Sequence, residues 1–76
     1  MIVKEFFYQD ILSTARWVEG SNDKMLYTEK STGRTFIGPP LPAHATVVLV
    51  EVSIAPDKNG RYEILQVIDY TPSEPA

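Results

Sequence analysis

An almost continuous run of Val and Leu in residues 45–54 constrains the fold of this chain more than any other feature. The run reads Ala-Thr-Val-Val-Leu-Val-Glu-Val-Ser-Ile, and β-branched residues in such a run favour a strand. Side chains alternate along a strand, so one face carries Thr46, Val48, Val50, Val52 and Ile54. The other face carries Val47 and Leu49, followed by Glu51 and Ser53. We therefore expect a strand whose first half is apolar on both faces.

A turn and a second apolar segment follow this run. Residues 56–60 read Pro-Asp-Lys-Asn-Gly, and Asn59-Gly60 tolerates the positive φ angles of hairpin turns. Residues 61–70 then alternate, which predicts that Tyr62, Ile64, Ile68 and Tyr70 share one face and that Leu65 and Val67 lie on the other. The two segments predict an antiparallel hairpin.

The first half of the chain contains further strand patterns and one ambiguous segment. Residues 2–8, 24–29 and 34–37 favour strands, the last two joined by a turn at residues 31–33. Residues 11–19 place Ile11, Leu12, Ala15 and Val18 at helical spacing, with Asp10 as a helix N-cap and Gly20 after the last turn. A second strand that ends in a turn at residues 19–23 fits the same segment, and both alternatives remain open.

These strands define the expected fold class. Five strands within residues 1–70 predict a mainly β domain, a small barrel or curled antiparallel sheet of the OB or SH3-like type. If residues 11–19 form a helix, the class becomes α+β. Residues 71–76 contain two prolines in a polar segment, so we expect a flexible tail outside the sheet.

The residue inventory argues against catalysis and cofactors. The chain of 76 residues has no cysteine, and its single histidine, His44, follows a proline-rich segment, where we expect an exposed loop. One histidine and no thiolate leave a zinc site short of ligands, and no glycine-rich phosphate loop is present. We expect no metal, no cofactor, no small-molecule ligand and no enzymatic activity.

Charge and hydropathy bear on location and partners. The net charge is −3, and no stretch resembles a membrane span or a signal peptide. We expect a cytoplasmic protein with no membrane partner.

Apolar residues on both faces of three segments, 2–8, 45–49 and 64–68, predict a protein partner. One short helix cannot cover the outer face of such strands, and monomers rarely expose a large apolar patch. We therefore expect a non-catalytic interaction module, such as a small subunit, adaptor or inhibitor, that binds a partner or a second copy of itself. Aromatic anchors dominate interface energies, which singles out Phe6, Tyr8 and Trp17. A register error of one residue would move each side chain to the other face and weaken this expectation.

The alternative function is single-stranded nucleic-acid binding by an OB-type fold. It would combine cations with stacking rings, and the candidates are Arg16, Trp17, Lys24, Tyr27, Arg34 and Phe36. Convergence of the basic residues on one face would favour it, whereas interleaved carboxylates would favour the protein partner. Pro39-Pro40-Leu41-Pro42 also matches the minimal Pro-x-x-Pro pattern, which is either a ligand motif or a stiff loop.

Overall fold

The structure, a computed structural model, describes residues 2–42 and 44–73, which form a mainly β fold. Within these residues the elements are β1 (Ile2–Phe7), α1 (Gln9–Leu12), β2 (Arg16–Trp17), β3 (Met25–Glu29), β4 (Arg34–Gly38), β5 (Ala45–Ser53) and β6 (Arg61–Pro72). The strands pair in the order β1-β5-β6-β4-β3-β2. Neighbours are antiparallel except for β4 and β6, which run parallel. The mainly β class is confirmed.

The sheet differs from the predicted barrel or curled antiparallel sheet. It is open, because β1 and β2 lie at opposite ends of the strand order, and it is mixed, because it contains one parallel pair. The chain between β4 and β6 includes all of β5, which brings β6 back alongside β4 in the same direction. Local residue patterns predict strands but do not specify such a long-range pairing, so this part of the prediction was wrong.

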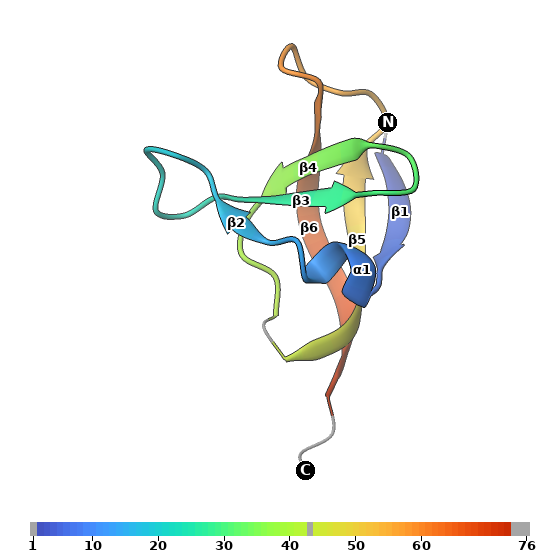
Figure 1. Ribbon diagram of the computed structural model, residues 1–76. Helices are drawn as coiled ribbons and strands as arrows, with labels where there is room; N and C mark the ends of the chain where they lie inside the picture. The colour runs from blue at the N-terminus through green and yellow to red at the C-terminus, as the bar shows by residue number, and fades with distance from the viewer. Residues whose placement is uncertain (1, 43, 74–76) are drawn as a thin grey trace.

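The core lies where β3 and β4 cross β5 and β6 (Figure 1). The first residues of β6, Arg61–Glu63, pair with β4, and the rest of the strand pairs with β5. Phe7 of β1 contacts Phe36 of β4, with ring centroids 4.7 Å apart. Further buried side chains fill the space between these strands: Ile11, Tyr27, Leu41, Ala45, Val48, Val50, Val52 and Ile64.

The predicted hairpin of β5 and β6 is confirmed. Gly60 has a φ of 79°, and the Asp57 carboxylate accepts hydrogen bonds from the backbone N–H groups of Asn59 (2.8 Å) and Arg61 (3.0 Å). Val48, Val50 and Val52, which were predicted to share one face of β5, are all fully buried. Thr46 and Ile54 are exposed, however: the register shifts between Ala45 and Val47, and Ile54 lies beyond the strand.

The alternation predicted for β6 was wrong beyond Ile64. The register shifts twice, between Leu49 and Val50 and between Glu51 and Val52. As a result Val67 pairs with Val50 and packs against the core, as Ile64 does opposite Val52. A bulge adds a residue to one strand and changes which side chains face inward, and alternation alone does not reveal where bulges occur.

Residues 11–19 were predicted to form either a helix or a strand, and the structure contains a short piece of each. One helical turn spans Gln9–Leu12, and the two-residue strand β2 then pairs with β3. The Thr14 hydroxyl ends the turn, because it donates to the carbonyl of Ile11 (2.6 Å) and accepts the N–H of Thr28 (2.8 Å). Asp10 lies inside the helix rather than at its N-cap, and Gly20 (φ 81°) lies in the turn after β2.

The other strands match their predicted ranges closely, but β6 is longer than expected. It continues through Thr71 and Pro72, which pair with Val47 and Ala45. The Thr46 hydroxyl also donates to the carbonyl of Thr71 (3.2 Å). The last part of the predicted tail, residues 74–76, lies outside the described residues.

Candidate interaction surface

The face of β1 and β5 that points away from the core carries apolar side chains. We call it the outer face and define its apolar part by Ile2, Phe6, Val47 and Leu49. Phe6 pairs directly with Leu49, so both side chains lie on the same side of the sheet. Phe6 is 56% and Ile2 48% exposed, and Val47 and Leu49 are half-buried. The outer face is therefore an apolar stripe open to solvent.

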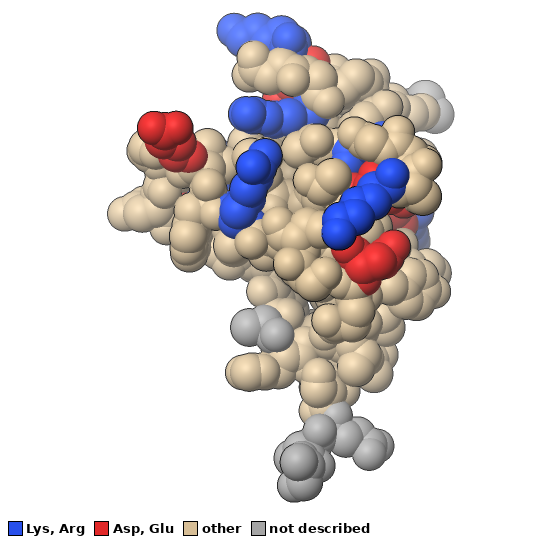
Figure 2. Space-filling model, viewed as in Figure 1, with Lys and Arg blue, Asp and Glu red and all other residues tan. Residues whose placement is uncertain are grey.

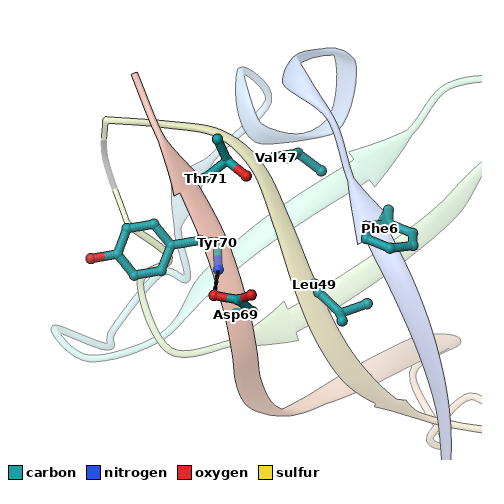
Figure 3. Close-up of a pocket in the computed structure, with 6 residues that line it drawn as sticks. All are labelled: Phe6, Val47, Leu49, Asp69, Tyr70 and Thr71. Carbon is teal, nitrogen blue, oxygen red and sulfur yellow. Dashed lines mark hydrogen bonds between the residues drawn. The ribbon is translucent and has the colours of Figure 1, made fainter. Parts of the chain in front are cut away.

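A shallow hollow lies beside Phe6, Val47 and Leu49 (Figure 3). Its volume is about 70 Å³, and its lining comes from three strands: Phe6 of β1, Val47 and Leu49 of β5, and Asp69, Tyr70 and Thr71 of β6. In Figure 3 the Tyr70 ring points away from Phe6 and Leu49. The Asp69 carboxylate accepts the N–H of Tyr70 (2.8 Å). The hollow is too small for a substrate and resembles a contact for one apolar side chain.

One charged pair lies within the apolar stripe, between Ile2 and Phe6, and one carboxylate lies beside the stripe on β6. Lys4 of β1 pairs with Glu51 of β5, and Glu51 accepts a hydrogen bond from the side chain of Gln66 on β6. Asp69 of β6 pairs with Leu49. The outer face is thus basic along β1 and acidic along β5 and β6.

The three predicted contact residues do not form one surface. Phe6 and Tyr8 are neighbours, with ring centroids 6.2 Å apart, and Tyr8 is 57% exposed just beyond β1. Trp17 lies on β2, at the opposite end of the strand order. It is 55% exposed and lines two other hollows, of about 450 and 410 Å³.

Two of the predicted nucleic-acid contacts lie in the core. Tyr27 is 2% and Phe36 0% exposed, so neither ring can stack on a base. The Tyr27 hydroxyl accepts the N–H of Leu41 (3.0 Å) and donates to the sulfur of Met25 (3.8 Å). Burial raises the pKa of Tyr27, and the hydrogen bond from Leu41 opposes the shift. These rings fill space between strands, and the expectation that they stack on bases was wrong.

Arg34 is occupied by protein contacts. Its guanidinium donates to both oxygens of Glu5 (2.6 and 2.8 Å) and to Glu29 (2.7 Å). The hydrogen bonds to Glu5 are the largest cause that raises the pKa of Arg34 above its ordinary value. The same group lies 5.1 Å from the centroid of the Phe36 ring. Arg34 therefore has a structural role and is not free to bind a phosphate.

The remaining basic candidates are spread out. Arg16 and Trp17 line one hollow, whereas Lys24 lines another, beside Asp57 and Glu63. Figure 2 shows basic side chains at separate places on this face, with acidic groups directly below one of them. The six predicted residues do not form a single site.

Two residues that matter for the surfaces described above were not among the predicted site residues. Leu49 was predicted to lie on the second face of β5, and that alternation was the signal that could have identified it. Arg61 lines the same hollow as Arg16 although 45 residues separate them in sequence, so no local pattern could have paired them.

Comparisons with known proteins do not assign a function to these surfaces. No family model, curated protein or solved structure matches the chain. Among residues 2–42 and 44–73, no three His, Cys, Asp or Glu side chains gather as a metal site would need. In the same residues no helix is long and apolar enough to span a membrane. His44 is exposed, as predicted.

Proposed function

We propose that this protein is a non-catalytic interaction module whose outer face binds a second copy of the chain. The observation that supports the proposal is the exposure of Phe6 beside half-buried Val47 and Leu49 on the adjacent strand. An exposed apolar stripe of this kind is typical of a protein interface. A small domain also gains stability from association, because its own core is limited.

The charges on the outer face support a second copy as the occupant. A two-fold axis parallel to β5 would lay β1 of one copy across β6 of the other. By the register, Lys4 of one copy would then lie across Gln66 of the other, beside the Glu51 carboxylate that Gln66 contacts. Phe6, Val47 and Leu49 would be buried between the two copies, next to the charged pair of Lys4 and Glu51. This self-complementarity favours a symmetric dimer over binding to an unrelated acidic or basic surface.

The proposal predicts that a charge in the stripe abolishes dimer formation. We expect wild-type protein at about 100 µM to be mostly dimeric, and Phe6→Asp and Leu49→Asp to be monomeric. Phe6 is exposed, so its substitution should leave the thermal unfolding of the monomer nearly unchanged. Sedimentation velocity over a concentration series measures the mass of each variant.

A matched control separates the outer face from apolar exposure in general. Ile54 is 52% exposed but lies in the loop after β5, so Ile54→Asp should remain dimeric. Wild-type protein that stays monomeric throughout the series, or a Phe6→Asp variant that dimerises normally, would contradict the proposal.

A further inference from the structure

A second surface, between β2 and the start of β6, contains two arginines around one hollow. Arg16 of β2 and Arg61 of β6 line a hollow of about 410 Å³ together with Trp17, Val18, Glu19 and Leu26. The register explains the position of Arg16, which pairs with Leu26 of β3. Arg61 comes from the start of β6, where that strand pairs with Thr35 of β4.

Both guanidinium groups are available to a ligand. Among the residues that the structure describes, both ion pairs involve Arg34, and neither Arg16 nor Arg61 donates a side-chain hydrogen bond. Glu19 is the acidic residue in the lining, so two arginines against one glutamate give the hollow a net charge of +1. This local charge is opposite in sign to that of the whole chain. An anion is therefore the ligand class that the hollow favours.

The indole of Trp17 adds a flat apolar surface beside these cations. Trp17 is 55% exposed and lines both this hollow and the neighbouring one, which is bounded by Leu12, Met25 and Pro40. A ring in this position can stack on a planar group while an adjacent arginine binds a phosphate. An acidic peptide would use the arginines but not the ring.

We propose that Arg16, Trp17 and Arg61 form a binding site for single-stranded nucleic acid, in which one base stacks on Trp17 and neighbouring phosphates contact the two arginines. Arg16 and Trp17 are two of the six nucleic-acid contacts predicted from the sequence, and Arg61 is a new member of the site. It does not depend on the outer face, so it can fail or hold independently of dimer formation.

The first test uses the fluorescence of Trp17, the only tryptophan in the chain. A mixed-sequence single-stranded DNA of about 10 nucleotides should quench this fluorescence saturably at low salt, and added salt should reverse the quenching. Polyglutamate of equal charge should give little quenching. An absence of quenching by DNA, or equal quenching by polyglutamate, would overturn the proposal.

The second test compares variants by fluorescence anisotropy of a labelled oligonucleotide. Arg16→Gln and Arg61→Gln should each weaken binding and reduce the salt slope by about 1. Trp17→Ala should weaken binding about fivefold or more, because a stacked base is lost. Lys30→Gln removes the same charge from the exposed turn between β3 and β4 and should have a clearly smaller effect. If Lys30→Gln weakens binding as much as the arginine variants do, the oligonucleotide is held by non-specific attraction to basic residues, and the assigned site is wrong.

Discussion

Arg34 connects β4 to β1, two strands that are not neighbours in the sheet. Its guanidinium donates hydrogen bonds to both carboxylate oxygens of Glu5 and to one carboxylate oxygen of Glu29. The same group lies over the rings of Phe36 and Tyr62. The side chain combines the planar fork and the ring contact that distinguish arginine from lysine. A basic residue that appears in sequence as a nucleic-acid contact thus holds two strands of the core together.

This cluster predicts acid sensitivity. A hydrogen bond from the Thr32 hydroxyl, above all, and then the contacts with Arg34, hold the pKa of Glu29 below its ordinary value of 4.5. A carboxylate with a lowered folded-state pKa stabilises the fold above its unfolded pKa, and this contribution is lost as pH falls through the lowered value. We expect Glu29→Gln to cost about 1 kcal/mol at pH 7 and almost nothing at pH 2. Urea unfolding at both pH values measures the difference, and an equal cost at both would refute the assignment.

The contact between β4 and β6 depends on a residue without a side chain. Gly38 is buried at the end of β4, and a Cβ atom there would lie 2.6 Å from the Cβ of Ile64 and 3.1 Å from its carbonyl oxygen. The glycine therefore lets the two strands approach closely. The strand predicted from the sequence ends at residue 37, because nothing local to Gly38 indicates which strand will pass beside it.

Gly38→Ala should therefore destabilise the protein. We expect a loss of about 1–3 kcal/mol, because the new methyl group forces the strands apart. The loss should exceed the small gain that alanine brings by restricting the unfolded chain. Urea unfolding at low protein concentration, where dimer formation does not contribute, gives the difference. A midpoint equal to or above that of the wild type would show that the contact can relax without cost.

Elements with strong local signals were predictable, and those that depend on distant contacts were not. The hairpin of β5 and β6 follows from the Val-rich run and Asn59-Gly60, both of which are visible in sequence. The bulges of β6 are not visible, because they reflect how that strand fits against β5. Residues 11–19 were ambiguous because a single helical turn and a two-residue strand are each too short for a clear periodicity.

At the scale of the whole molecule, the parallel pairing of β4 with β6 decides the topology. The sequence analysis did not predict this pairing. The position of each predicted site residue followed from that topology rather than from residue type: Tyr27 and Phe36 became core, and Phe6 and Tyr8 stayed exposed. The apolar second face of β5 was predictable from alternation and is the half-exposed centre of the outer face.

The two proposed surfaces differ in how strongly they respond to salt. Each chain carries a net charge of −3, so salt screens the repulsion between two copies and should not weaken an apolar dimer. Binding of nucleic acid to Arg16 and Arg61 should instead weaken steeply as salt rises. A salt series on one sample can therefore separate the two activities.

The most direct test of the outer face is an isotope-filtered NMR experiment on a sample in which labelled and unlabelled chains are mixed. It detects contacts between copies and is blind to contacts within one chain. We predict intermolecular signals between the Phe6 ring and the methyl groups of Val47 and Leu49, with none from Ile54. Intermolecular signals confined to residues outside the outer face, or none at a concentration of about 1 mM, would contradict the proposal that this face joins two copies of the chain.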